Sequence, residues 1–376
     1  MATPTLEDVA QAAGVSVSTA SRVFTGTAKV RGDKHAAVMR AAEQLGYRPN
    51  AIARSLASGR SLLIGVLTQD ISSPFYGEVL RGIEQGLEGS SYSAIFASGH
   101  WRVEEEASAL HGLMGRPVDG LIVLGGHTPD ERLAAMAAKV PLIAVGRSVR
   151  GLEDQCLRID NVQGSYDCAR HLLELGHRRI AYIAGPESHR DACERLQGFQ
   201  RALADWKVEA NPSLIVEGDF LEPSGLLAVE SLFARGALFS AVMAANDQMA
   251  YGARLGLYRR GIRVPEDISL VGFDDLSSSA FTTPPLTTMR QPTYEMGVAA
   301  AEAILATLGG APLPTADFRV QLMVRESTAP THRERQRLSP LDPRPAGPAG
   351  NGTPSPASAQ ASEPRPQDPP FPGERL

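Results

Sequence analysis

The chain has 376 residues, of which 43% are hydrophobic and 21% are charged, and its formal net charge is −5. Since a typical domain has about 100–200 residues, this length predicts two or three domains. The acidic total excludes a uniformly basic nucleic-acid-binding protein. Residues 1–60 nevertheless carry eight basic and four acidic side chains, so we expect a basic N-terminal module that contacts an anionic partner.

The three cysteines, Cys156, Cys168 and Cys193, lack the spacing of a metal site or a disulfide framework. They indicate free thiols in a reducing compartment, and we expect neither a metal nor a cofactor. No apolar run approaches the ~18 residues of a membrane-spanning helix, and the N-terminus lacks the regions of a secretory signal. We therefore expect a cytoplasmic protein with no membrane partner.

The first predicted elements are three short helices. Thr5, with a carboxylate three residues later, is typical of a capping box, and Gly14 ends this first helix. Ser16 caps a second helix over residues 17–24, and a third spans residues 34–45. Two short helices joined by a Gly-containing turn are typical of a helix-turn-helix. Their predicted common core comprises Leu6, Val9, Ala10, Ala20, Val23, Phe24, Ala37, Val38, Ala41 and Leu45.

The outer face of the second helix carries Val17, Ser18, Thr19, Ser21 and Arg22, with no acidic side chain among them. Hydroxyl groups suit phosphate oxygens, Val17 suits a thymine methyl group, and Arg22 can bind guanine O6 and N7 together. The face therefore favours DNA binding. An ordinary solvated amphipathic helix remains the alternative.

Residues 50–60 read NAIARSLASGR, which predicts a short helix that Asn50 caps. Isolated helices shorter than about 12–15 residues are marginal in water. The segment also carries Leu56, a large apolar residue, beside Arg54. We expect it to become helical only on DNA.

Apolar runs alternate with amphipathic stretches between residue 61 and about residue 326. Continuous apolar strands separated by helices indicate parallel sheets that are covered on both faces. This number of strands fits two open α/β subdomains better than one sheet, and a TIM barrel remains the alternative. The predicted strands span residues 62–67, 93–98, 120–125, 141–146, 179–185, 213–218, 240–245 and 269–275.

Polar and aromatic residues follow several of these strands, where open α/β sheets bind their ligands. Carboxylates and amides accept hydrogen bonds from vicinal hydroxyls, and aromatic rings stack on sugar C–H faces, so together they predict a polyol pocket. Any single Asp or Asn here is equally typical of a helix cap or a turn. The residues are Asp70, Phe75, Tyr76, Asp191, Arg195, Asp219, Phe220, Asn246, Asp247, Asp274 and Asp275.

The stretch TLEDVAQAAGVSVSTASRVFTG, followed by LGYRPNAIARSL, resembles the N-terminal signature of the lactose-repressor (LacI/GalR) family. The resemblance implies that Val17, Ser18 and Arg22 read bases and that Leu56 is a minor-groove wedge. Thr25 stands where members often have Asn, which leaves one local backbone contact open. The implied DNA-binding residues are Thr5, Leu6, Ser16, Val17, Ser18, Thr19, Ser21, Arg22, Tyr47, Asn50, Ala53 and Leu56.

Further motifs, LGHRRIAYIAGP, ERLQGFQRAL, AVMAANDQMAYGA, ISLVGFDD and PPLTTMRQP, resemble the core domain of the same family. That domain is similar to periplasmic sugar-binding proteins, with two subdomains and a ligand in the cleft between them. Residues 191–198 resemble the galactose-type branch, and His189 stands near an arginine of the purine-responsive branch, so a sugar is favoured over a nucleobase. The implied effector-binding residues are Phe75, Tyr76, Asp191, Arg195, Phe220, Asn246, Asp274 and, more weakly, Gln291.

The expected organisation has four parts. Residues 1–49 form the helix-turn-helix domain, residues 50–60 the hinge helix, and residues 61–331 the effector-binding and dimerisation core. Residues 332–376 are rich in Pro, Ala, Gly and Ser, which predicts a disordered tail. Because this tail has no leucine heptad, we expect a homodimer.

The sequence therefore predicts a nucleoid-associated transcriptional repressor that binds a pseudo-palindromic double-stranded operator. A small sugar controls its operator affinity allosterically. A nucleobase corepressor is one alternative, and a sugar-binding protein without a DNA role is another. An enzyme with Asp274 and Asp275 as paired carboxylates is a third, but the chain lacks a nucleophile elbow, a P-loop and an HExxH motif.

Overall fold

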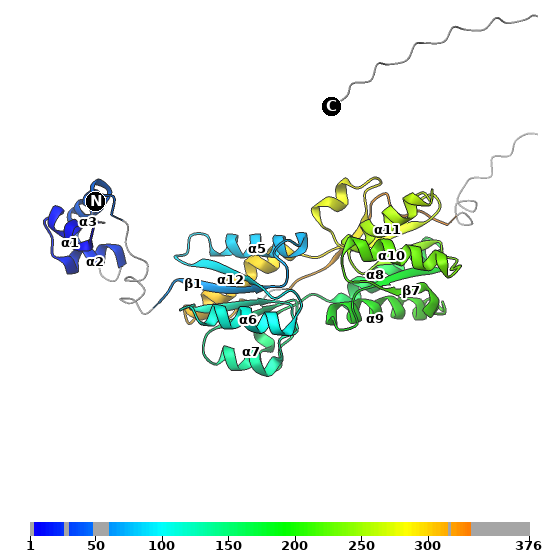
Figure 1. The fold of residues 1–376 in the computed structure, drawn as a ribbon, viewed down its shortest axis with the longest axis horizontal. Helices are drawn as coiled ribbons and strands as arrows, with labels where there is room; N and C mark the ends of the chain where they lie inside the picture. Colours follow the sequence, from blue (N-terminus) through cyan, green and yellow to red (C-terminus); the bar gives the residue numbers. More distant parts are fainter. Residues whose placement is uncertain (1–3, 26–29, 48–59, 315–316, 332–376) are drawn as a thin grey trace, which may run out of the picture.

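The computed structural model describes residues 4–25, 30–47, 60–314 and 317–331 (Figure 1). These residues form a three-helix domain followed by two α/β subdomains. The predicted hinge helix and tail lie outside the described residues, and so do Asn50, Ala53 and Leu56. Within the described chain, no helix combines the length and apolar character needed to cross a membrane.

The N-terminal domain consists of α1 (Leu6–Ala12), α2 (Val17–Thr25) and α3 (Gly32–Leu45). The predicted capping box is confirmed, because the Thr5 side chain accepts from the backbone N–H of Asp8 and the Asp8 carboxylate accepts from Thr5. Gly14 and Gly46 adopt φ angles of +64° where α1 and α3 end, a conformation that glycine adopts without strain.

The core of this domain differs from the prediction at several positions: Ala37 is half-buried and is not part of the cluster, whereas Ala42, which was not predicted, is buried. Leu45 was expected inside, but it is 38% exposed. Tyr47 fills this place instead, and its ring lies 5.5 Å from that of Phe24. The buried residues are Val9, Ala10, Ala20, Val38, Ala41 and Ala42.

The first subdomain contains a five-stranded parallel sheet of order β2-β1-β3-β4-β5. Helices cover both of its faces, and α5 packs against α12, which follows much later in the chain. A Cβ atom on Gly82 would lie 2.1 Å from the carbonyl oxygen of Tyr294, so this close helix packing requires glycine. The elements are β1 (Leu63–Thr68), α5 (Pro74–Leu87), β2 (Ser93–Ser98), α6 (Val103–Met114), β3 (Gly120–Leu124), α7 (Asp130–Ala137), β4 (Leu142–Val145), η1 (Glu153–Gln155), β5 (Cys156–Leu157) and α12 (Thr293–Leu308).

The second subdomain contains a six-stranded sheet of order β11-β10-β9-β8-β6-β7, in which β11 alone is antiparallel to its neighbour. Its elements are α8 (Asn161–Glu174), β6 (Ile180–Ala184), α9 (Arg190–Asp205), η2 (Pro212–Leu214), β7 (Ile215–Glu217), α10 (Glu222–Ala234), β8 (Ala241–Ala244), α11 (Asp247–Arg259), β9 (Ser269–Asp274), η3 (Ser277–Phe281), β10 (Thr287–Arg290) and β11 (Gln321–Met323).

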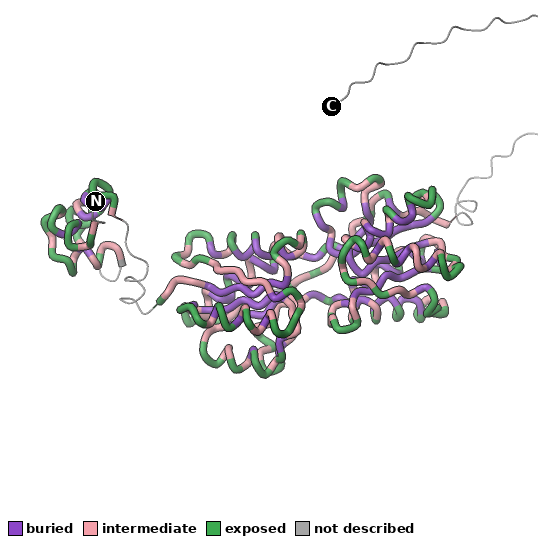
Figure 2. The backbone as a smooth tube through the Cα atoms, in the orientation of Figure 1, coloured by how far each residue is buried: buried purple, intermediate pink, exposed green. Residues whose placement is uncertain are grey.

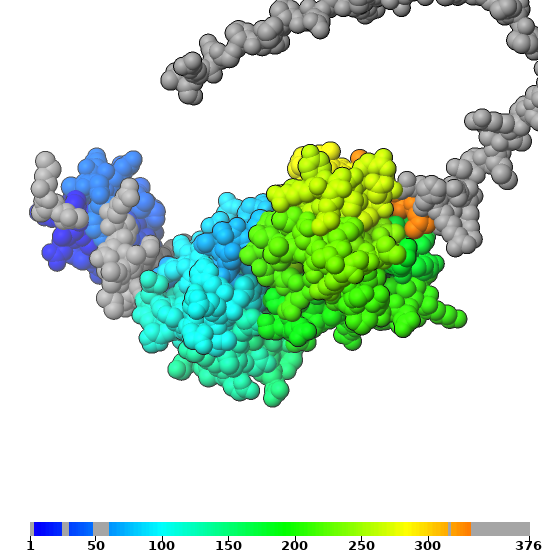
Figure 3. Space-filling view, turned by 45° about the vertical axis from the view of Figure 1, so that its right-hand side comes forward, coloured from blue at the N-terminus to red at the C-terminus, as the bar shows by residue number. Residues whose placement is uncertain are grey.

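The chain crosses between the two subdomains at residues 158–160, at residues 291–292 and between α12 and β11 (Figure 1). Figure 2 shows that the strands in the middle of each subdomain are the most deeply buried segments, and Figure 3 shows the two subdomains packed against each other. Two open sheets confirm the predicted α/β class and exclude the TIM barrel. All eight predicted strands are present. The strands missed were the short β5, β10 and β11, which carry no continuous apolar run.

Candidate functional site

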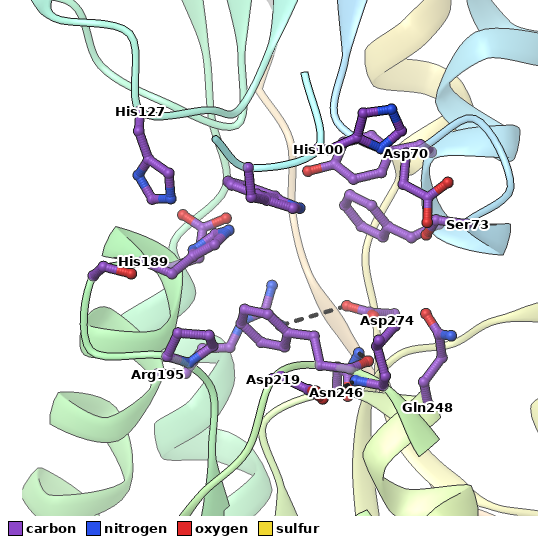
Figure 4. Close-up of a pocket in the computed structure, with 18 residues that line it drawn as sticks. Asp70, Ser73, His100, His127, His189, Arg195, Asp219, Asn246, Gln248 and Asp274 are labelled. Atoms are coloured by element: carbon purple, nitrogen blue, oxygen red, sulfur yellow. Dashed lines mark hydrogen bonds and ion pairs between the residues drawn. The ribbon is translucent and has the colours of Figure 1, made fainter. Parts of the chain in front are cut away.

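A cleft of about 400 Å³ lies between the two subdomains, at the carboxyl ends of strands from both sheets (Figure 4). Seven of the eight predicted effector-binding residues line it. Gln291 is the exception, because it lines a smaller adjoining cavity behind the cleft. The seven are Phe75, Tyr76, Asp191, Arg195, Phe220, Asn246 and Asp274.

Arg195, on α9, is the central cation of the cleft and is only 4% exposed. Its Nε donates to the Oδ1 of Asn161 over 2.9 Å, and its Nη1 donates to the carbonyl oxygen of Ala245 over 2.7 Å. The guanidinium carbon lies 4.0 Å from the centre of the Phe273 ring. These contacts compensate a charge that would be costly to bury alone.

Asp274, at the end of β9, is the partner of this arginine. Its Oδ1 lies 3.5 Å from the Nη1 of Arg195 and accepts a hydrogen bond of 2.6 Å from the Nε2 of Gln291. Burial raises the pKa of Asp274, and the charge of Arg195 and the Gln291 hydrogen bond oppose that rise. Gln291 was predicted as an effector contact, whereas the structure places it where it fixes the Asp274 carboxylate.

Asn246 is a helix cap, one of the two alternatives that the sequence left open, and it also lines the cleft. It caps α11, because its Oδ1 accepts from the backbone N–H of Met249 over 2.9 Å. Its Nδ2 donates to the carbonyl oxygen of Phe220 over 2.8 Å. Phe220 has a φ angle of +70°, which is unusual for a large side chain. The cap of α11 therefore also holds an aromatic ring in the cleft.

An aromatic cluster forms part of the wall that the first subdomain contributes. The Trp101 ring lies 6.2 Å from Tyr76 and 5.4 Å from His127, which belong to the same subdomain. It also lies 4.2 Å from the ring of His189, which belongs to the second subdomain. Phe220 in turn lies 5.0 Å from His189. These rings make a contact that spans the cleft.

The loop carrying Trp101 is held in an uncommon conformation. His100 and Trp101 have φ angles of +51° and +57°, a region that costs non-glycine residues energy and clusters at functional sites. Gln69 fixes this turn, because its side-chain oxygen accepts from the N–H of Trp101 over 3.0 Å and its carbonyl accepts from His100 over 2.8 Å. The Trp101 side chain is therefore positioned before any ligand arrives.

Glu106 organises the neighbouring loop in the same way. Its fully buried carboxylate accepts hydrogen bonds from the backbone N–H groups of His127 and Thr128, over 2.8 Å and 2.7 Å, and from the Thr128 hydroxyl.

His189, across the cleft, stays neutral because burial and the charges of Arg195 and His127 lower its pKa to about 3.

The strand-end reading did not reach five residues of the cleft wall, namely His100, Trp101, His127, Leu221 and Gln248. His100, Trp101 and His127 follow the predicted strands at 93–98 and 120–125, whose ends were not read, and Leu221 and Gln248 lie just beyond residues that were read. Reading three residues beyond every predicted strand would have found all five.

The predicted DNA-contacting residues of α2 lie on one outer face. Val17 is 43% exposed and Arg22 is also exposed, with no hydrogen-bond partner within the described part of the chain. The hydroxyl of Ser16 lies 3.0 Å from that of Ser18 and 2.9 Å from that of Thr19. Ser16, Val17, Ser18 and Arg22 are exposed, whereas Thr19 is half-buried.

The other described candidates for DNA contact also have structural roles. The Thr5 hydroxyl binds Asp8, and Leu6 is half-buried against the small core. Tyr47 packs on Phe24. Ser21 is half-buried on α2.

A helix-turn-helix domain joined to a core with a ligand-sized cleft defines a ligand-responsive DNA-binding protein. A family model described as bacterial regulatory proteins, lacI family, matches residues 5–50, and one for the periplasmic-binding-protein-like domain matches residues 169–328. The HTH-type transcriptional regulator GalR of Escherichia coli (strain K12) is 37% identical over 328 residues, which span 86% of this chain and 96% of that protein.

Solved structures resemble the chain as a whole. The lac repressor dimer bound to operator and the anti-inducer ONPF matches with a TM-score of 0.78 and 31% identity, over 87% of this chain and 100% of that one. A complex of the transcriptional regulator CelR with cellobiose matches with a TM-score of 0.64 and 35% identity, over 86% of this chain and 99% of that one. The chain belongs to the lacI family and is a DNA-binding transcriptional regulator, not an enzyme.

Proposed function

We propose that this regulator is a repressor whose affinity for a near-palindromic operator is controlled by a sugar bound in the interdomain cleft. The observation that carries the proposal is the cleft itself. It brings carboxylates, an amide, a guanidinium group and aromatic rings from two subdomains around one cavity of about 400 Å³. Such a set of groups suits a ligand with several hydroxyls and apolar C–H faces.

The exposed face of α2 supports the DNA-binding half of the proposal. Val17, Ser18 and Arg22 are exposed side chains on one short helix, and such a helix fits the major groove. We assign base reading to these three residues. The adjoining hydroxyls of Ser16 and Thr19 serve the phosphate backbone.

The relatives support a sugar as the effector. CelR has been solved as a cellobiose complex, and a regulator of the same family from Enterococcus faecium with bound ribose. In this chain, Asp191 and Asp274 would accept from ligand hydroxyls, and Phe220 would stack on the sugar ring. The sugar would act as an inducer, so its binding would relieve repression.

We assign a homodimer to the working state, because a two-fold operator is read by two symmetry-related helices. Exposed apolar side chains on neighbouring helices of the second subdomain support this assignment. Leu227 on α10 is 64% exposed, Tyr258 on α11 is 77% exposed and Phe281 on η3 is 86% exposed. A second copy of the chain would cover them.

Allosteric control follows from the construction of the cleft. Because the ligand would contact both subdomains, its binding alters the angle between them, and residues 50–60 carry that change to the DNA-binding domain. We retain the division into residues 1–49, 50–60, 61–331 and 332–376. The coupling is reciprocal, so operator DNA must change effector affinity by the same factor.

The test is fluorescence anisotropy of the full chain on duplexes selected from a randomised palindromic library. A panel of sugars and nucleobases is then titrated into the complex. We expect one or more sugars to release the operator and the Asp274→Ala variant to bind operator without responding. Release by nucleobases alone would replace the sugar with a purine-type effector. Failure to select any duplex would contradict the repressor function.

A further inference from the structure

We propose that the cleft accepts an uncharged sugar and rejects sugars that carry a phosphate or carboxylate group. This inference rests on the proposed function and narrows its effector to one chemical class. It is carried by the balance of charged groups around the cavity, and by what each of them already binds.

Carboxylates dominate the wall of the cleft. Of its described lining residues, four are acidic and one, Arg195, is a permanent cation, while none is lysine. Figure 4 shows three of them, Asp70, Asp219 and Asp274, on more than one side of the cavity. A ligand anion placed anywhere within it would therefore lie near a carboxylate. The four are Asp70, Asp191, Asp219 and Asp274.

Two of the three nitrogen atoms of the one guanidinium group are already engaged, and the third cannot supply two parallel donors alone. Arg195 donates to the amide oxygen of Asn161 and to the carbonyl oxygen of Ala245, and it faces Asp274 at 3.5 Å. Phosphate recognition by arginine usually needs two parallel N–H donors that are free. Freeing them here would leave the buried Asp274 carboxylate without its cation.

Two nearby arginines outside the cleft wall share one carboxylate. The Nη2 of Arg158 lies 2.9 Å from Glu194, and the Nε of Arg190 lies 2.8 Å from the same carboxylate. Glu194 therefore offsets one of the two positive charges and holds both guanidinium groups in ion pairs.

Helix N-termini are the one feature that could favour an anion, because several helices begin at the cleft and their N–H groups attract negative charge. The protein satisfies these ends itself. Pro74 begins α5 and has no N–H to offer, while Asp191, Glu222 and Asp247 lie in the first turns of α9, α10 and α11. Acidic side chains thus accompany the N-termini of α9, α10 and α11 before a ligand binds, whereas α5 offers one N–H fewer and has no acidic residue in its first turn.

Asp191 is the residue that most directly sets this selectivity. It lines the cleft, and no hydrogen bond to its carboxylate is present within the described part of the chain. By contrast, Asp70 accepts from Ser72 and Asp219 accepts from Leu221. The free oxygens of Asp191 can accept from sugar hydroxyls, and the same oxygens repel an anion at close range.

Calorimetric titration of the full chain at pH 8 tests the proposal. The probes are glucose, galactose, ribose and cellobiose, with the 6-phosphates, uronates and uronamides of the two hexoses and ribose 5-phosphate. We expect a neutral sugar to bind and its charged derivatives to bind at least tenfold more weakly. The uronamide, which has the shape of the uronate without its charge, should recover affinity.

Two outcomes would overturn the inference and can be told apart. Binding of a uronate or a phosphate as tightly as the neutral sugar would overturn the charge selectivity and leave sugar control standing. Absence of binding by every sugar, neutral or charged, would overturn both this inference and the proposed effector class.

The Asp191→Asn variant tests the assigned residue. We expect the ratio of uronate affinity to uronamide affinity to rise at least fivefold over that of the unmodified chain. Asp205→Asn, at the exposed far end of the same helix, is the matched control and should leave the ratio unchanged. An unchanged ratio in Asp191→Asn would show that Asp191 does not determine the preference for uncharged sugars.

Discussion

Arg22 and Arg195 lie in the regions that we propose bind DNA and the effector, and their surroundings are opposite. Arg22 on α2 is exposed and has no hydrogen-bond partner within the described residues. Arg195 on α9 is 4% exposed and is held by Asn161, Ala245 and Asp274. One side chain is free before its ligand arrives, and the other is already part of a network.

The difference follows from what each ligand can supply. A DNA duplex brings a dense row of phosphates and a rigid groove, so its contacts can order long exposed side chains on binding. A small ligand offers only a few hydrogen bonds. The cleft must therefore hold its polar groups in place beforehand, because ordering them on binding would consume the available affinity.

Of the substitutions proposed, Arg195→Leu should have the largest effect. It tests how much the buried arginine contributes to the stability of the fold. Removing one member of a buried ion pair costs about 3–5 kcal/mol, because the remaining charge is left without compensation. We expect a loss of that order in the free energy of unfolding by urea at pH 8. The loss should shrink at pH 5, because the pKa of Asp274 is already raised by burial and the abandoned carboxyl can take up a proton.

Arg190→Leu, five residues earlier on the same helix, is the matched control. Its side chain is 55% exposed and pairs with Glu194, and exposed ion pairs contribute only about 0–1 kcal/mol. Equal losses in the two variants would show that the Arg195 network does not stabilise the core.

The contrast between these regions also explains what the sequence could predict. Helices, strands and the first residues after each strand follow from local patterns, so seven cleft residues and the outer face of α2 were found directly. The role of Gln291 depends on a crossing segment that places it behind Asp274. No local pattern reports such a long-range contact.

The conformation of Trp101 could not be predicted for a related reason. Its conformation depends on Gln69, which lies 32 residues earlier in the chain, and its ring partner His189 belongs to the other subdomain. Likewise, Leu45 continues the apolar stripe of α3, but Tyr47 from the following segment takes its place in the core. Tertiary packing decided these positions.

Arg22→Ala should have a smaller effect, confined to DNA. Because the side chain is exposed, the free energy of unfolding should change by no more than about 0.5 kcal/mol. Operator binding should weaken by about 1–3 kcal/mol, with relaxed specificity at one base position. Anisotropy on the selected duplex and its single-base variants measures both quantities.

Arg40→Ala, an exposed arginine on α3, is the control for a general loss of positive charge. Equal weakening of Arg22→Ala on every duplex would identify Arg22 as a phosphate contact and contradict its assignment to base reading.

His189 should have the smallest effect, which is on the pH dependence of the free energy of unfolding. Its pKa in the folded chain is about 3, below the ordinary value of about 6.5, so the fold holds the imidazole neutral. Its contribution to stability is complete above about pH 6.5 and is lost as the pH falls below that value. At pH 5.5 the loss amounts to about 1.4 kcal/mol relative to pH 7.5.

His189→Phe isolates this contribution, since it keeps a ring against Trp101 and Phe220 but cannot be protonated. Raised pKa values of Asp247 and Asp274 act in the opposite sense, favouring stability as the pH falls, and both remain in the variant. The difference between the two unfolding free energies should therefore grow by about 1.4 kcal/mol on acidification. The exposed His111 on α6 offers His111→Phe as the control with no such change. Parallel pH profiles for His189→Phe and the unmodified chain would show that the contact across the cleft does not require a neutral imidazole.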